Sequence, residues 1–320
     1  MTSLPMPVPL QFTDLAKVRL PSGPVHLAIG MFDGVHLGHR ATIQPAIKAA
    51  RASNGMAVVL TFWPHPSSLF RPSDPTRLIQ SPATKAVVLG SLGVDAIVTL
   101  PFTSEFAQLP AEVFLPWLKR HLPMLAAVYV GENFRYGCRR QGDAGSLCAS
   151  GASLGLDVHV AAPMAVAGEG VSSTRIRTLL LAGEIAQANA LLGYPYFSDG
   201  VVSTGKRLGR TIGVPTLNLS WSPDLKPRFG VYAVRVRGSK SASALPGVAN
   251  YGLRPTVENT HEPKLEVHVL SDCPYDAGDH LTVDWLHFIR PEQKFSDLDA
   301  LRAQIARDAE SARAQLAERP

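Results

Sequence analysis

The chain has 320 residues, of which 46% are hydrophobic and 18% are charged. This composition is typical of folded proteins, and the length exceeds what one compact core usually holds, so we expect two domains. The formal net charge is +5, but no basic run is interleaved with aromatic residues, which argues against nucleic-acid binding. No apolar stretch is long enough to span a membrane, so we expect no membrane partner either.

The N-terminus and the cysteines bear on cellular location. Residues 1–17 lack a basic segment followed by an apolar one, so we expect no signal peptide. The three cysteines are scattered and form no C-x-x-C pair, which argues against a disulfide framework and a structural zinc site. These features favour a cytoplasmic protein and leave open whether it forms a homo-oligomer.

The first 160 residues alternate β-rich segments with helix-like ones. Nearly continuous apolar runs lie at residues 25–31, 56–62, 94–100 and 126–130. Such runs are typical of strands buried on both faces of a parallel sheet. One intervening helix is well delimited, because Ser81 can cap it, Pro82 suits its first position and Gly93 can end it. Two other helices contain Pro45 and Pro116, where we expect kinks. This alternation predicts a doubly wound, Rossmann-like α/β sheet.

After residue 183 the pattern changes. A helical stretch at residues 184–192 ends at Gly193. Short alternating strands follow at residues 231–236, 264–270 and 281–289. Because no helices separate these strands, they predict an antiparallel barrel or sandwich. The chain closes with an amphipathic helix, whose start at residues 296–299 resembles a capping box. We therefore expect two domains, at residues 1–186 and 187–320.

The first predicted strand runs directly into the motif GMFDGVHLGH at residues 30–39. Glycines at a strand-to-helix turn let backbone N–H groups approach a phosphate, and the helix N-terminus adds partial positive charge. His36 and His39 can both donate hydrogen bonds to phosphoryl oxygens. Packed or surface histidines are the alternative, but the carboxyl end of a first strand is where such sheets bind ligands. The predicted phosphate-binding residues of this motif are Gly30, Phe32, Asp33, Gly34 and Gly38.

A second candidate anion site lies at residues 171–177, with the sequence VSSTRIR. Hydroxyl side chains at a helix start, together with arginines, can bind phosphate groups. An ordinary capped helix with surface arginines is the alternative. The candidate ligands here are Ser172, Ser173, Thr174 and Arg177.

The second half contains a basic Gly-rich loop followed by a T-x-N pattern. The loop residues that could fold over an anion are Gly205, Lys206, Arg207, Gly209 and Gly213. In a strand, residues i and i+2 share a face, so Thr216 and Asn218 could jointly hold Mg²⁺ and phosphate. On a later predicted strand, Glu266 faces away from its apolar neighbours and could act as a general base on a hydroxyl. A glycine turn and a solvated strand face are the alternatives.

In their order and spacing these motifs resemble the family of bacterial bifunctional riboflavin kinase/FAD synthetases. The first half is similar to nucleotidyltransferases with the HxGH motif, and the second to riboflavin kinase, whose motif reads G-x-P-T-A-x-N. The sequence departs from the family at Trp63, where an acidic residue is more usual, and at Val214, where Phe is usual. Leu217 replaces the usual Ala, but it should point away from Thr216 and Asn218, so we expect metal binding to be kept.

The resemblance implies an α/β doubly wound nucleotidyltransferase domain, followed by an antiparallel β-barrel riboflavin-kinase domain with a C-terminal helix. It implies that ATP with Mg²⁺ phosphorylates riboflavin, with Glu266 taking the proton from the terminal ribityl hydroxyl. The phosphate of FMN would then attack the α-phosphate of a second ATP, and FAD and pyrophosphate would form. His36 and His39 would stabilise the developing charge, while Ser173, Thr174 and Arg177 hold the leaving triphosphate portion. The implied flavin contacts are Phe62, His65, Asn133, Phe134 and Arg254.

Two other interpretations remain open. The chain could retain only one of the two activities, or it could be a non-catalytic protein that senses flavins or nucleotides. Because both motif sets are intact, the sequence favours a bifunctional enzyme over either alternative.

Overall fold

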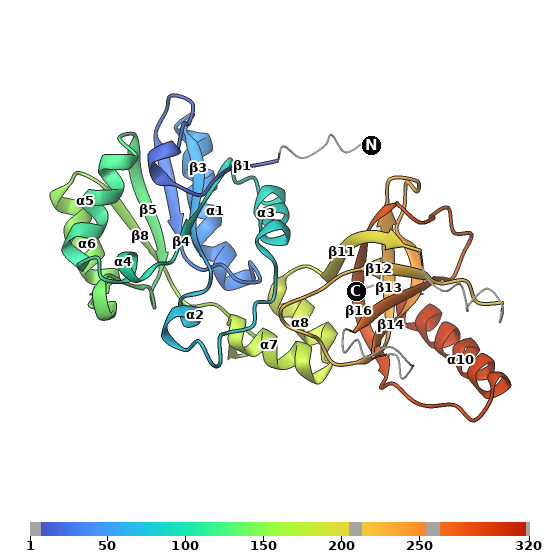
Figure 1. The fold of residues 1–320 in the computed structure, drawn as a ribbon. Helices are drawn as coiled ribbons and strands as arrows, with labels where there is room; N and C mark the ends of the chain where they lie inside the picture. Colours follow the sequence, from blue (N-terminus) through green and yellow to red (C-terminus); the bar gives the residue numbers. More distant parts are fainter. Residues whose placement is uncertain (1–7, 205–212, 254–262, 318–320) are drawn as a thin grey trace. The chain divides into compact units, whose positions relative to one another are not determined.

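The computed structural model describes residues 8–204, 213–253 and 263–317 (Figure 1). The chain forms two compact units, an N-terminal unit at Met1–Ser173 and a C-terminal unit at Thr174–Pro320. Each unit contains its own main sheet and its own buried core. None of the helices in the described ranges is long and apolar enough to cross a membrane.

The N-terminal unit is built on a parallel sheet with the strand order β1-β4-β3-β2-β5-β8. These strands are β1 (Leu10–Phe12), β2 (Val25–Ile29), β3 (Met56–Trp63), β4 (Ala96–Pro101), β5 (Leu125–Gly131) and β8 (Asp157–Ala161). Strands β2 to β5 are the four expected from the apolar runs, so the prediction of a parallel α/β sheet is confirmed. Every residue of β2 is buried, as a strand covered on both faces should be.

Helices and short elements connect these strands, with helices on both sides of the sheet (Figure 1). The helices are α1 (Leu37–Ala52), α2 (Pro66–Phe70), α3 (Pro82–Ser91), α4 (Ser104–Ala107), α5 (Ala111–His121) and α6 (Ala144–Ser153). The short strands are β6 (Arg135–Tyr136), β7 (Gly142–Asp143), β9 (Ala165–Val166) and β10 (Glu169–Gly170). Single 3-10 turns lie at Leu15–Lys17 and Cys138–Arg140.

The helix ends and the internal prolines can be compared with the sequence expectations. Ser81 caps α3 by accepting the backbone N–H of Thr84 at 3.1 Å, and Pro82 is the first helical residue, as predicted. Pro45 and Pro116 lie inside α1 and α5, and neither proline ends its helix. Residues on the apolar side of α1 are buried against the sheet, and this packing outweighs the one missing N–H of the proline.

The C-terminal unit is a closed antiparallel barrel with the order β11-β12-β15-β14-β13-β16, so of the two expected architectures the barrel is correct. Its strands are β11 (Tyr196–Ser203), β12 (Leu217–Ser220), β13 (Gly230–Gly238), β14 (Leu245–Gly252), β15 (Lys264–Val269) and β16 (His280–Arg290). Its helices are α7 (Ser173–Ala182), α8 (Ile185–Leu192) and α10 (Leu298–Ala317). The interior is aromatic, because the side chains of Trp285, Tyr232 and Tyr251 are fully buried.

The C-terminal helix α10 packs on β13, β14 and β16. Its cap is Asp297, whose carboxylate accepts the backbone N–H of Ala300 at 2.8 Å, and not Ser296 as the capping-box pattern suggested. The cap therefore lies one residue later than expected. The buried Asp308 accepts hydrogen bonds from Arg290 at 2.7–3.1 Å, which fixes the helix to the end of β16.

The expected domain boundary between residues 186 and 187 falls inside α8. This helix packs on β11 and β16, where Asn189 donates to the carbonyl oxygen of Trp285 at 2.8 Å and accepts from the N–H of Tyr196 at 2.7 Å. The end of α7 is bound to the same unit, because Arg228 donates to the carbonyl oxygens of Leu180 and Ala182. Both helices therefore contribute contacts to the barrel unit, and the position of a functional boundary stays a prediction.

These contacts predict that residues 174–320 fold alone and are more stable than residues 187–320. The shorter fragment lacks the buried Ile185 and the carbonyls that Arg228 binds, which should lower its melting temperature by about 5 °C or more. Thermal unfolding of both fragments, followed by circular dichroism, measures the difference. Equal melting temperatures would support the boundary at residues 186/187 instead.

Candidate active sites

The loop between β2 and α1 leaves the sheet where the strand order reverses. From β2 the sheet continues to β3 and β4 on one side, while β5 and β8 lie on the other side. In open α/β sheets, ligands bind at this switch point, outside the carboxyl ends of the strands. The fold therefore places the GMFDGVHLGH motif at the sheet edge where a ligand is expected.

The loop itself has a tightly turned backbone. Phe32, Gly34 and Val35 have positive φ angles of 47°, 82° and 39°, a region that residues other than glycine rarely adopt. The buried carboxylate of Asp33 holds this turn, because it accepts the backbone N–H groups of Ile79 at 3.0 Å and Gln80 at 3.3 Å. Asp33 thus links the loop to the segment that precedes α3.

The two histidines of the motif lie together at the start of α1. His36 is buried and caps the helix, with its Nδ1 accepting the backbone N–H of His39 at 3.2 Å. A neutral imidazole that accepts at Nδ1 carries its proton on Nε2, so Nε2 becomes a hydrogen-bond donor. The two rings are stacked with centroids 3.6 Å apart, and Phe32 packs edge-on against the ring of His39. The predicted pair is therefore brought together as one imidazole cluster.

Two glycines of the motif are explained by ring packing. A Cβ on Gly38 would lie 3.2 Å from the ring of His36, and a Cβ on Gly30 would lie 2.9 Å from the ring of Phe32. Both contacts are closer than a side chain normally tolerates. The glycines therefore let the aromatic rings lie against the backbone, a role that the sequence pattern alone did not indicate.

The second anion motif begins beside the first. Ser173 donates from Oγ to the backbone carbonyl of Asp33 at 2.9 Å, and Ser172 before it is exposed. Thr174 and Arg177 continue α7 into the C-terminal unit. Their role as triphosphate ligands stays a prediction.

Two of the predicted flavin contacts are joined by a chain of aromatic rings. Phe62 contacts Phe106, and the chain continues through Phe114 and Tyr136 to Phe134, with ring centroids 5.1–6.5 Å apart. Phe62 and Phe134 are half-buried against the core of the N-terminal unit. Core packing therefore accounts for part of their contacts, and binding of a flavin ring stays a prediction.

The other two described flavin candidates occupy different environments. His65 caps α2, since its Nδ1 accepts the backbone N–H of Ser67 at 3.1 Å. Asn133 is exposed in the turn after β5. Capping gives His65 a structural task, so its involvement with a flavin, like that of Asn133, is untested.

In the barrel, three polar side chains lie abreast on adjacent strands. Asn218 of β12 pairs with Glu266 of β15, which in turn pairs with Asn250 of β14. Residues paired across an antiparallel sheet point to the same face. Because the flanking Leu219 and Leu265 are buried inside the barrel, the three polar side chains face outward, where each is half-buried.

The segment before β12 is held beside this polar row. His268 donates from Nδ1 to the carbonyl oxygen of Pro215 at 2.8 Å, which fixes the approach of Thr216 to β15. Leu217 pairs with the buried Val267 and so points into the barrel. The expectation that Leu217 points away from its polar neighbours is confirmed.

The oxygen-bearing side chains near Asn218 can be compared with the ligands that a magnesium ion prefers. Mg²⁺ prefers oxygen ligands, often one or two carboxylates together with substrate phosphates. Asn218 and Glu266 are paired here, and Thr216 directly precedes β12. Across residues 8–204, 213–253 and 263–317, no group of three or more His, Cys, Asp and Glu side chains is arranged to hold a metal ion. A metal here would therefore depend on Thr216, Asn218, Glu266 and the phosphates of ATP.

Several predicted ligands lie outside the described residues. These are Gly205, Lys206, Arg207, Gly209 and Arg254. The last glycine of the loop, Gly213, is described and has a φ of 78°, which suits the turn that leads into β12.

Two polar residues beside these sites were not among the candidates. Asn250 is across from Glu266, which only the strand register reveals. Lys85 of α3 is buried and donates to the carbonyl oxygen of Met31 at 2.8 Å. Burial lowers the pKa of Lys85 to about 8, while the charge of Asp33 acts in the opposite direction. A lysine in an amphipathic helix is usually at the surface, so the sequence carried no signal for this one.

Comparisons with known proteins find a related family for each of the two halves of the chain. Sequence models of two families match the chain, FAD synthetase at residues 21–175 and riboflavin kinase at residues 192–316. The bifunctional riboflavin kinase/FMN adenylyltransferase of Escherichia coli K12 is 40% identical over 288 residues, which cover 90% of this chain and 91% of that protein. Proteins of the same name from Haemophilus influenzae and Listeria monocytogenes are 37% and 34% identical, and cover 90% and 95% of this chain.

A solved structure is similar along almost the whole chain. It is a crystal structure described as a macrolide-efflux protein from Streptococcus pneumoniae, with a TM-score of 0.84, 30% sequence identity, and coverage of 96% of this chain and 99% of that one. The two folds and their motifs define a chain that joins a nucleotidyltransferase unit to a riboflavin-kinase barrel. The chain belongs to the family of bifunctional riboflavin kinase/FMN adenylyltransferases, which confirms the resemblance of its motifs.

The packing of Gly38 leads to a testable prediction. Gly38→Ala should push the ring of His36 out of its stack with His39, because the new Cβ would lie 3.2 Å from that ring. The melting temperature should stay the same or rise, since alanine is favoured over glycine in helices by up to about 1 kcal/mol. Side-chain NMR spectra of the full chain should show shifted resonances for both rings.

The matched control is Gly145→Ala. Gly145 occupies the same second position in α6, but its nearest contact, to a carboxylate oxygen of Asp143, is an ordinary 3.5 Å. In the Gly145→Ala protein, the resonances of the His36 and His39 rings should be the same as in the unmodified chain. Unchanged resonances in the Gly38→Ala protein would contradict the proposed reason for this glycine.

Proposed function

We propose that this chain phosphorylates riboflavin with ATP to give FMN, and then transfers an adenylyl group from a second ATP to FMN to give FAD and pyrophosphate. The observation that carries the proposal is that one chain holds both functional clusters, the stacked His36/His39 pair and the Asn218–Glu266–Asn250 row. Family membership supports it, because the relatives named above carry both activities in their names.

In the kinase step, Glu266 is the general base. Its carboxylate takes the proton from the terminal ribityl hydroxyl of riboflavin, whose oxygen then attacks the γ-phosphate of ATP. Thr216 and Asn218 would hold a magnesium ion, and such an ion would supply neutralisation of the charge on the ATP phosphates. Asn250, on the other side of Glu266, is placed to orient the carboxylate or the hydroxyl through its side-chain amide.

In the adenylyl transfer step no base is needed, since the phosphate of FMN is already an anionic nucleophile. It attacks the α-phosphate of ATP, and pyrophosphate leaves. His36 donates from Nε2 to the developing phosphoryl charge, because its Nδ1 is engaged by the N–H of His39. Ser173, Thr174 and Arg177 hold the β- and γ-phosphates that leave. A donor aimed at such charge is worth about 3–4 kcal/mol in a transition state.

The location proposed for these reactions is the cytoplasm. All three cysteines are free thiols in the structure, and free thiols persist in a reducing compartment. Riboflavin, FMN and ATP are the partners that the two reactions require.

The direct test is the conversion of riboflavin by the purified chain. With ATP and Mg²⁺ we expect FMN, FAD and pyrophosphate, separated by chromatography. EDTA should stop both steps, because each depends on a metal ion that neutralises ATP phosphates. Formation of FMN alone would leave only the kinase, and binding of flavin or ATP without any product would favour the sensor interpretation.

Substitution should separate the two sites. Glu266→Gln keeps the size of the side chain but removes the base, so FMN formation should fall by about 10²-fold or more. The same protein supplied with FMN should still make FAD at a near-normal rate. Replacement of both His36 and His39 by alanine should do the opposite and lower FAD formation by about 10²–10³-fold, with FMN accumulating.

Each variant is the control for the other, since each should keep one of the two reactions. Loss of both reactions in a folded Glu266→Gln protein would contradict separate sites. A single shared ATP site would then explain the data better.

A further inference from the structure

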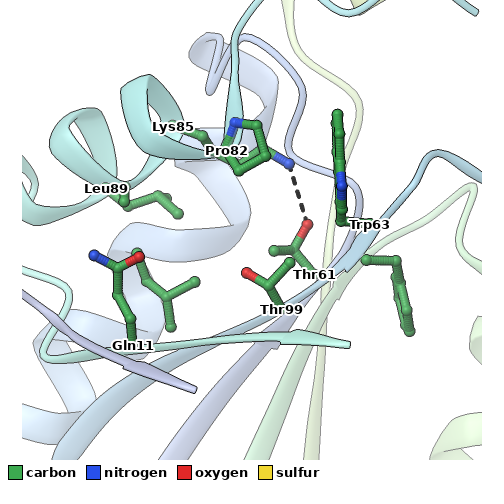
Figure 2. Close-up of a pocket in the computed structure, with 10 residues that line it drawn as sticks. Gln11, Thr61, Trp63, Pro82, Lys85, Leu89 and Thr99 are labelled. Carbon is green, nitrogen blue, oxygen red and sulfur yellow. Dashed lines mark hydrogen bonds between the residues drawn. The ribbon is translucent and has the colours of Figure 1, made fainter. Parts of the chain in front are cut away.

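A charged side chain is buried directly behind the N-terminal site. Lys85 lies on α3 and only 5% of it is exposed. Its Nζ donates to the carbonyl oxygen of Met31 at 2.8 Å and to Oγ1 of Thr61 at 3.3 Å, and Thr61 Oγ1 itself donates to Met31 at 3.0 Å. Figure 2 shows the Lys85 ammonium reaching Thr61 across a small pocket.

Burial of an ammonium group is costly, so its presence here calls for a reason. Removing such a group from water is unfavourable unless it is paired and hydrogen-bonded, and an apolar residue of similar length would avoid the cost. Desolvation by this burial lowers the pKa of Lys85 to about 8, against the opposing influence of Asp33. The packing of α3 alone therefore does not explain why a charged residue is buried at position 85.

The partners of Lys85 indicate what the charge does. Met31 directly precedes the strained turn at residues 32–35, two residues after the end of β2 at Ile29. The same turn is held a second time from the segment before α3, where the N–H groups of Ile79 and Gln80 bind the carboxylate of Asp33. Lys85 therefore binds a carbonyl oxygen at the start of the turn, and the backbone N–H groups before α3 bind a carboxylate in its middle. Together they fix the position from which His36 caps α1.

We propose that Lys85 is a positioning residue for adenylyl transfer: it holds the Met31 carbonyl so that residues 32–36 present the imidazole of His36 to the phosphoryl group. The inference rests on the proposed function of the N-terminal site. Lys85 acts through the loop backbone, and the charge it adds behind the loop also favours an anionic ligand in front of it.

The surroundings of Lys85 make it suitable for substitution. It lines a cavity of about 30 Å³ together with Gln11, Thr61 and Thr99, which is room for about one water molecule or for the extra atoms of an arginine. These three residues come from β1, β3 and β4 and do not titrate. Asp33, from the loop, is the charged group that acts on Lys85. A change near pH 8 that depends on Lys85 can therefore be attributed to its ammonium.

The test compares Lys85→Met and Lys85→Arg in the full chain. Lys85→Met should lower kcat for FAD formation from FMN about tenfold or more, with the KM values for ATP and FMN changed less than kcat. Riboflavin phosphorylation in the same preparation should be unchanged, which reports on the amount of folded enzyme. The melting temperature should change little, because the loss of the Lys85 hydrogen bonds and the removal of a buried charge act in opposite directions. Lys85→Arg should keep most of the rate.

The pH profile distinguishes positioning by a charge from simple packing. In the unmodified enzyme, kcat for FAD formation should decline as the pH rises above about 8, where Lys85 loses its proton. Lys85→Arg should lose this decline, since a guanidinium stays charged. Lys119→Met is the matched control. Lys119 also donates to a backbone carbonyl, that of Leu125 at 2.6 Å, but at the opposite end of β5 from the loop, so its removal should leave FAD formation unchanged.

Three outcomes would overturn the inference. One is a wild-type rate of FAD formation in Lys85→Met, and another is an equal loss in Lys119→Met. The third is an alkaline decline in Lys85→Arg identical to that of the unmodified enzyme, a result that decides the matter even if Lys85→Met fails to fold. Absence of FAD formation in the unmodified enzyme would instead overturn the proposed function, and this inference with it.

Discussion

The N-terminal site depends on one requirement, that the buried polar groups of a short strained loop all find partners. Residues 32–36 are buried, and the backbone at Phe32 and Val35 lies in a region that favours glycine. Such a conformation persists only when its surroundings determine it more strongly than the strain opposes it. The required contacts come from Asp33, which binds backbone N–H groups before α3, and from Lys85, which binds Met31. The geometry of the two imidazoles is a consequence of these bonds.

The C-terminal site depends on a different constraint, the register of the barrel strands. Asn218, Glu266 and Asn250 belong to three strands that are adjacent in the barrel but distant in sequence. A slip of one residue in any of these strands would turn its polar side chain into the aromatic core and its apolar neighbours outward. Burial of leucine and valine on the inner face therefore fixes the polar row on the outer face. The hydrophobic core and the candidate catalytic groups are specified by the same alternation.

The sequence predicted most of what depends on local pattern. The parallel strands, the cap of α3 at Ser81 and the end of α8 at Gly193 all follow from short segments. The His36/His39 pair was found because both residues lie within one turn of a helix. The cap of α10 was displaced by one residue because Asp297 and Ser296 are both good capping residues, and the pattern could not separate them.

What the sequence could not reveal depends on contacts between distant segments. Asn250 joins the polar row only through the pairing of β14 with β15. The sequence alone suggests that Lys85 is an ordinary surface lysine, and only the packing of α3 beside the loop shows that it is buried. The phosphate-binding role of Gly38 stays a prediction, and its packing against the ring of His36 was not visible in the sequence. In each case the residue type was visible, but its partner lay in another element.

The two sites should therefore differ in how they respond to change elsewhere in their units. Groups on strands are positioned by many backbone hydrogen bonds, so loss of one side chain moves them little. Groups on a strained loop are positioned by a few side-chain contacts, and each contact carries a larger share of the geometry. Asp33 and Lys85 secure different points of the turn, its middle and the Met31 carbonyl at its start, so neither can fully replace the other. The candidate site of the N-terminal unit is for this reason the one whose geometry should depend more on residues outside the loop itself.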